Sequence, residues 1–112
     1  MPPREARVRS VTLPNGAATP TAGLRLGMDT LLAVRSPSTY DGTTMTFTVC
    51  DTLAGTYDTV YNEDGTAYTI TLAASRFTPV DYTKFLGALY LKPVAGTNQT
   101  GDTILSLLVS PL

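Results

Sequence analysis

Two segments of the chain contain threonines that alternate with apolar residues. Residues 44–50 read Thr-Met-Thr-Phe-Thr-Val-Cys, which places Met45, Phe47 and Val49 on one face of an extended strand and the threonines on the other. Residues 66–72 repeat this arrangement. Because β-branched threonine suits the outer side of a pleated sheet, the pattern predicts half-buried antiparallel strands with threonine on their exposed faces.

Other apolar segments are also expected to form strands. They are residues 7–13, 24–34, 86–92 and 103–110, and the last two are expected to pair with each other across a turn-rich connection. Within residues 24–34, the stretch 31–33 taken alone is equally compatible with a helical turn.

Two local signals predict turns. The run Asn-Glu-Asp-Gly at 62–65 can supply the positive φ angles of a tight turn, so residues 57–72 are expected to form a hairpin. Residues 80–85 are expected to form a short helical turn, because Asp81 can cap its start.

Short strands separated by glycine and proline at spacings of about 8–12 residues are typical of all-β domains. A chain of 112 residues has the size of one such domain, and no helix long enough for an α/β crossover is evident. We therefore predict an all-β fold: an antiparallel β-sandwich or a jelly-roll-like barrel with an extended N-terminal arm.

The arm is assigned to residues 1–22, ahead of a sandwich domain at 23–112. It carries four of the eight prolines and three of the eight basic residues, Arg4, Arg7 and Arg9. One interpretation is a frayed terminus with solvated charges. Another is a segment that adds a strand to a neighbouring subunit and pairs its arginines with acidic groups there. Nucleic-acid binding is the least favoured, because no aromatic platform flanks the arginines.

The chain has few of the side chains that enzymes commonly use for catalysis. The chain has no histidine and a single cysteine, so Ser-His-Asp or Cys-His sites, internal disulfides and multi-cysteine metal cages are all excluded. Asp58, Glu63, Asp64 and Asp81 are the candidates for a glycosidase-like pair or a calcium site, but most of them flank a turn, where acidic residues are common. Cys50 is expected to be a small, buried or half-buried apolar residue. We predict no enzyme, cofactor or metal site.

The low charge of the chain points to protein partners. The formal net charge is -1, which gives no field for attracting nucleic acid or anionic lipid, and no apolar run is long enough to span a membrane. The start of the sequence lacks the apolar stretch of a signal peptide, so folding in the cytosol is expected. Only 15% of residues are charged, against about 25% in average soluble proteins, which suggests a surface partly covered by neighbours.

Six tyrosines are many for this length, and tyrosine is favoured at interfaces. By alternation Tyr68 is assigned to the interior. Tyr57 and Tyr61 are more plausible at a surface. The candidate interface residues are accordingly Arg4, Arg7, Arg9, Tyr57 and Tyr61.

One resemblance extends over the C-terminal two thirds of the chain. It rests on residues 55–57, 60–65, 73–77, 85–87 and 90–92, with Leu107 and the closing residues 111–112. These runs resemble small structural proteins of tailed bacteriophages, and in size and character the chain is most similar to capsid cement, or decoration, proteins.

The resemblance implies a sandwich or jelly roll that binds the outer surface of a capsid and clamps neighbouring major capsid protein subunits. It further implies a homo-oligomer, dimer or trimer, located on the virion and made in the host cytoplasm. The alternative is a tail or fibre accessory protein with a receptor- or glycan-binding sheet face. A more distant one is a glycan-binding module of a larger secreted enzyme.

Overall fold

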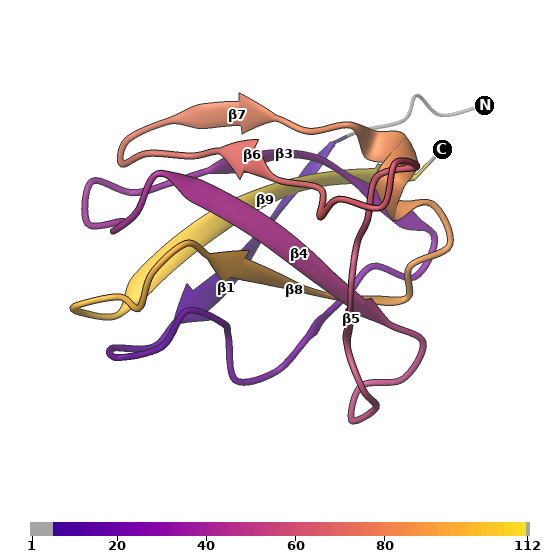
Figure 1. Cartoon of the computed structure of the whole chain (residues 1–112), viewed down its shortest axis with the longest axis horizontal. Helices are drawn as coiled ribbons and strands as arrows, with labels where there is room; N and C mark the ends of the chain where they lie inside the picture. The colour runs from indigo at the N-terminus through magenta and orange to yellow at the C-terminus, as the bar shows by residue number, and fades with distance from the viewer. Residues whose placement is uncertain (1–5, 112) are drawn as a thin grey trace.

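The structure, a computed structural model, describes residues 6–111 as two antiparallel sheets packed face to face (Figure 1). Sheet A has the order β1 (Arg7–Leu13), β9 (Thr103–Pro111), β3 (Asp29–Arg35), β7 (Phe77–Pro79). Sheet B has the order β2 (Leu24–Arg25), β8 (Tyr90–Ala95), β4 (Thr44–Cys50), β5 (Asp58–Thr59), with β6 (Ile70–Thr71) also paired to β4. A 3-10 helix, η1 (Tyr82–Phe85), precedes β8.

The strand order is that of a jelly roll. Early strands pair with late ones, β1 with β9, β2 with β8 and β3 with β7, so the chain forms a long antiparallel ribbon. The ribbon is folded over and closed by the pairs β3–β9 and β4–β8. Double-sheet jelly rolls are built in this way. The predicted all-β sandwich or jelly-roll class is therefore confirmed.

The core lies between the sheets where the alternating strands meet. On β4, Met45 and Phe47 are fully buried whereas Thr44 is exposed, as the alternation predicted. The ring of Tyr68 packs against the core, with its centroid 6.2 Å from that of Phe47 and 6.1 Å from that of Phe85. The interior placement of Tyr68 is thus confirmed, although its hydroxyl reaches the surface and accepts a hydrogen bond from the Asp81 backbone N–H.

The N-terminal segment is integrated into the sandwich. β1 pairs along its whole length with β9, and its inward residues Val11 and Leu13 are buried. The following loop is fixed by backbone hydrogen bonds, such as that from the Ala95 N–H to the Ala18 carbonyl. The sandwich therefore begins before the boundary predicted at residue 22, because β1 belongs to sheet A and its apolar face contributes to the core. Residues 1–5, with Arg4, lie outside the described residues.

The predicted hairpin over residues 57–72 is mostly replaced by another arrangement. β5 and β6 do not pair with each other, since β5 pairs with the end of β4 and β6 with its beginning. The intervening chain turns back through one bridge, Tyr61 with Ala67, around the predicted turn at 62–65. Both strands pair with β4, which has seven residues, whereas β5 and β6 have two each.

The pairing expected between residues 86–92 and 103–110 is wrong. β8 begins only at Tyr90 and lies in sheet B, whereas β9 lies in sheet A. Residues 86–89 form a turn with Gly87 at φ 85°, a left-handed conformation that breaks an extended strand. Similarly, Gly27 at φ 60° divides the strand expected over residues 24–34 into β2 and β3.

Two local expectations are confirmed. Residues 31–33 belong to strand β3 and not to a helical turn. The turn expected at 80–85 is η1, and the Asp81 side chain caps it by accepting a hydrogen bond from the Thr83 N–H at 3.1 Å.

Candidate functional site

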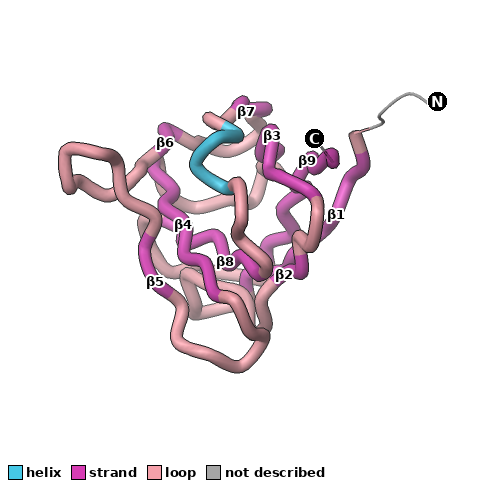
Figure 2. The backbone as a smooth tube through the Cα atoms, turned by 90° about the vertical axis from the view of Figure 1, so that its right-hand side faces the viewer, coloured by secondary structure: helices cyan, strands magenta, loops and turns pink. Residues whose placement is uncertain are grey.

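The two ends of the jelly roll present different loops. At one end, on the right in Figure 1, lie the β2–β3 turn, the loop at residues 51–57, the turn region at 60–69 and the segment 80–89 with η1. At the other end lie the loops 14–23, 36–43, 72–76 and 96–102. Figure 2 looks onto the first end and shows η1 beside β3, with the chain between β5 and β6 projecting from the sandwich.

Exposed apolar side chains gather at the first end. Nine large hydrophobic residues are exposed within residues 6–111, and six of them lie on these loops. We call this set the apolar end: Met28, Leu53, Tyr61, Tyr82, Leu86 and Leu89. Met28 is the most exposed, at 89% of its full accessible surface. Where exposed apolar side chains form one contiguous patch, the surface typically binds another protein.

Backbone hydrogen bonds hold the loops of the apolar end against one another. The N–H groups of Leu26 and Gly27 both donate to the Leu89 carbonyl, at 2.8 and 3.4 Å, which fixes the β2–β3 turn beside residues 86–89. The hydroxyl of Thr30 donates to the Tyr82 carbonyl at 2.8 Å and ties η1 to β3. The exposed side chains are therefore carried on an ordered backbone, which lowers the entropic cost of binding.

The opposite end is closed by polar contacts instead. Gln99 is only 2% exposed, and its side-chain amide bridges several loop groups. Its Oε1 accepts from the Asp41 N–H at 2.9 Å and its Nε2 donates to the Asp41 carbonyl at 3.0 Å. Asp41 in turn accepts hydrogen bonds from the N–H and hydroxyl of Thr100. This end is stabilised by hydrogen bonds internal to the protein.

The structure does not bring the predicted interface residues into one site. Arg7 forms an ion pair with Asp29, whose side chain is 6% exposed, so part of its role is to hold β1 to β3. Arg9 donates a long hydrogen bond of 3.4 Å to the Arg25 carbonyl. Both arginines lie on β1, at the edge of sheet A.

The two predicted tyrosines occupy different environments. Tyr61 is 60% exposed and belongs to the apolar end. Tyr57 is half-buried: its hydroxyl donates to the Leu53 carbonyl at 2.9 Å, and the Lys92 ammonium lies 4.5 Å from its ring centroid. Burial is the main cause that raises the pKa of Tyr57. Tyr57 thus packs loop 51–57 onto sheet B, and its role as an interface residue stays a prediction.

The acidic residues serve turns, as predicted. Asp64 accepts hydrogen bonds from the N–H and hydroxyl of Thr66, and Asp81 accepts the same pair from Thr83. These hydrogen bonds stabilise the charged forms and lower the pKa of both carboxyl groups. Within residues 6–111, no three His, Cys, Asp or Glu side chains are placed to hold a metal ion together. Cys50 is half-buried and unpaired, as expected.

Of the six residues of the apolar end only Tyr61 was predicted from the sequence, and three of the other five lie in segments expected to be strands. Met28, Leu86 and Leu89 each stand one or two positions from a glycine with positive φ. An apolar residue beside such a glycine is a usable signal, because a left-handed glycine turns the chain and leaves its neighbour on a loop.

Comparisons with protein families, with curated proteins and with solved structures found no match to this chain. Among the described residues, no helix has both the length and the apolar character needed to cross a bilayer.

Proposed function

We propose that this chain is a structural virion protein that binds the outer surface of a phage capsid and reinforces contacts between major capsid protein subunits. The observation that carries the proposal is the apolar end, where Met28, Leu86, Leu89 and their neighbours are exposed on hydrogen-bonded loops. The resemblance of the C-terminal two thirds to capsid cement proteins supplies the identity of the partner. The jelly roll itself is compatible with many functions and decides nothing alone.

The apolar end suits this role in energetic terms. Fully burying one large apolar side chain contributes about 1.5–3 kcal/mol, so two or three such contacts suffice for a modest single-copy affinity. Linking copies into a dimer or trimer multiplies that affinity without new contacts, because the later binding events become intramolecular. A small symmetric oligomer that spans several capsid subunits would clamp them together.

The first test uses charge at the apolar end. We expect the double variant Leu86→Asp and Leu89→Asp to lose co-sedimentation with shells assembled without this chain, because buried carboxylates are costly. The matched control is Phe77→Asp with Ile104→Asp, since these side chains are 51% and 57% exposed and lie outside the apolar end. Equal binding by both double variants would contradict the assignment of the contact surface.

The second test concerns the particle. Shells that carry the chain should show its density on their outer surface and should withstand heat and low salt better than shells that lack it. Absence of that density, or equal resistance, would contradict the cement function.

The tail or fibre accessory alternative would use an open sheet face. The outer face of sheet B is partly covered by loop 51–57, because Tyr57 packs across it next to Gly23 and Lys92. This cover disfavours a flat receptor- or glycan-binding face. Copy number separates the two functions, since a cement protein occurs many times per particle and a fibre component only a few times.

A further inference from the structure

β1 is an edge strand with one side unpaired. Among residues 6–111 its seven residues pair only with β9, so alternate residues direct their N–H and C=O groups away from the sheet. β2, an edge strand of sheet B, has only two residues. An edge of this length is a template for the addition of another strand.

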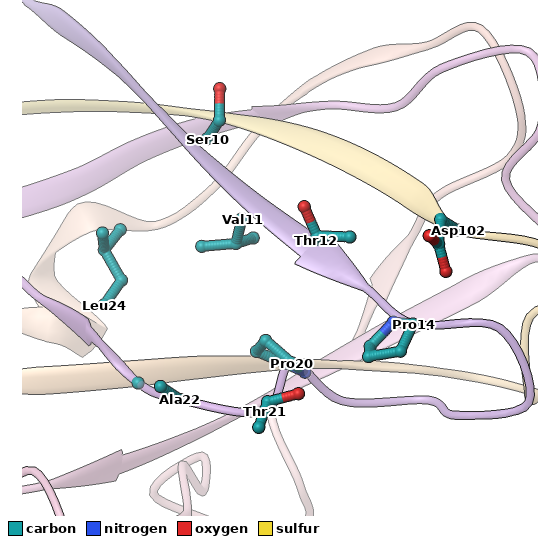
Figure 3. Close-up of a pocket in the computed structure, with 10 residues that line it drawn as sticks. Ser10, Val11, Thr12, Pro14, Pro20, Thr21, Ala22, Leu24 and Asp102 are labelled. Atoms are coloured by element: carbon teal, nitrogen blue, oxygen red, sulfur yellow. The ribbon is translucent and has the colours of Figure 1, made fainter.

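A cleft of about 450 Å³ runs beside this edge (Figure 3). One wall is β1, with Ser10, Val11 and Thr12, and the facing wall is the segment at residues 20–24. In Figure 3 the side chains of Val11, Leu24 and Pro20 lie between the two walls, and Pro14 is at one end. The cleft is therefore apolar at its centre and open along an unsatisfied strand edge.

The facing wall is fixed from behind by the tyrosine ring. Tyr57 packs so closely on Gly23 that a Cβ at this position would overlap the tyrosine hydroxyl and ring. The facing wall of the cleft is therefore packed against Tyr57 of loop 51–57.

Opposite charges lie at the two ends of the cleft. Just outside the cleft lining, next to Ser10 on β1, Arg9 donates a hydrogen bond to the Arg25 carbonyl. At the other end, Asp102 lines the cleft and accepts a hydrogen bond from the Asn15 N–H at 2.9 Å. A strand bound along β1 would have the positively charged Arg9 near one of its ends and the negatively charged Asp102 near the other.

We propose that β1 and this cleft bind an extended segment of another protein by strand addition. The segment has an acidic side chain opposite Arg9, apolar side chains over Val11 and Leu24, and a lysine or arginine opposite Asp102. Its backbone pairs with the free edge of β1, and its alternate side chains fill the cleft. This surface is distinct from the apolar end and extends the proposed function to a second contact.

A second copy of this chain is a poorer occupant of the cleft. In a β1–β1 pair, the partner's inward side chains at positions 11 and 13 would already be buried in the partner's own core, as Val11 and Leu13 are here. They could not enter the cleft, which would remain unfilled. The bound strand must therefore have side chains that face the cleft and are not already buried in the core of its own protein.

The probe is a capped synthetic peptide of about nine residues, a length typical of strands. Threonine occupies alternate positions, and the positions between read Asp, Val, Ile, Lys, with a second peptide of reversed sequence to allow for either strand direction. Titration into the ¹⁵N-labelled full chain should shift the amide signals of residues 8–14 and 20–24. If neither peptide perturbs these residues, the proposal is wrong.

A cleft-filling variant tests the location. Ala22 is exposed and lines the cleft, so Ala22→Trp should weaken peptide binding by about tenfold or more. Ala54→Trp is the matched control, because Ala54 is also exposed but lies on loop 51–57, outside the cleft lining, and it should bind as the wild type does. Undiminished binding by Ala22→Trp would overturn the proposal.

A charge-reversal variant tests the charge pairing between the cleft and the peptide without filling the cleft. Arg9→Glu should weaken the peptide with aspartate and strengthen the one in which lysine replaces it, each by several fold. Equal response to both peptides would contradict the charge pairing. Concentration-dependent dimerisation of the free chain that protects the β1 amides would favour a second copy and refute the peptide proposal. None of these outcomes affects capsid binding through the apolar end.

Discussion

Gln99 shows how one side chain closes a whole end of the sandwich. Its amide oxygen also accepts from the Thr103 hydroxyl at 3.1 Å, and its amide nitrogen donates to the Thr97 carbonyl at 3.2 Å, in addition to the Asp41 contacts. Every hydrogen-bonding atom of the buried amide is thus paired within the protein. Removing such a group leaves its partners unsatisfied, which costs more than the bonds themselves contribute.

We therefore expect Gln99→Leu to lower the free energy of unfolding by about 2–4 kcal/mol, measured by urea denaturation. The adjacent Asn98 is exposed, so Asn98→Leu should change it by less than about 0.5 kcal/mol. Equal effects of the two substitutions would show that the amide does not stabilise this end.

Three carboxylates share one hydrogen-bonding pattern, in which each accepts both the N–H and the hydroxyl of a threonine. The pairs are Asp41 with Thr100, Asp64 with Thr66, and Asp81 with Thr83. These hydrogen bonds lower the pKa of each carboxyl group from its usual value of 3.8.

A lowered pKa in the folded protein sets the direction of the pH dependence. The stabilisation is complete above the unfolded value and is lost as the pH falls through the lower folded value. The triple variant Asp41→Asn, Asp64→Asn and Asp81→Asn should therefore lose less unfolding free energy than the wild type between about pH 5 and pH 2. Urea denaturation across this range measures it, and parallel curves for the two proteins would contradict the assignment.

The contact between the β1–β2 loop and loop 51–57 couples two elements far apart in the sequence. Because Tyr57 occupies the space in which a side chain at position 23 would lie, we expect Gly23→Ala to destabilise the protein by about 1–3 kcal/mol. In the background of Tyr57→Ala the same substitution should cost clearly less, and a double-mutant cycle gives the coupling.

Gly101 supplies the matched control for that cycle. A Cβ there would meet nothing within 4 Å, and its φ is not in the left-handed region, so Gly101→Ala should change stability by less than about 0.5 kcal/mol. If Gly23→Ala costs the same with and without Tyr57, the tyrosine is not what excludes a side chain.

The sequence allowed good prediction at two places where the cause was local. Period-two alternation identified the buried face of β4 at Met45 and Phe47, and Asp81 was predicted to cap a turn that begins at the next residue. Strand pairing was harder to predict from the sequence, because whether β8 pairs with β4 or with β9 depends on how the whole ribbon folds over. The apolar end was missed for the related reason that exposure of Met28 and Leu86 follows from loop placement and not from residue type.

The jelly roll brings the two ends of the described chain together. Arg7 and Val109 are cross-strand partners, and Asp29 pairs with both Arg7 through its side chain and Pro111 in the sheet. The two ends of the described chain therefore lie on neighbouring strands, β1 and β9. Such proximity of termini is what makes circular permutation tolerable.

We expect a permutant joined through a Gly/Ser linker and reopened between Glu63 and Asp64 to keep its fold. Those residues are exposed at the turn between β5 and β6, outside the paired strands, so the loss should be about 1–3 kcal/mol in urea denaturation. Reopening between Asn98 and Gln99 should instead abolish cooperative unfolding, because it frees the amide that closes the opposite end. If both permutants fold equally well, the end of the sandwich at Gln99 is held by the sheets alone. If the permutant opened between Glu63 and Asp64 fails to fold, the turn at 62–65 contributes to closure of the ribbon.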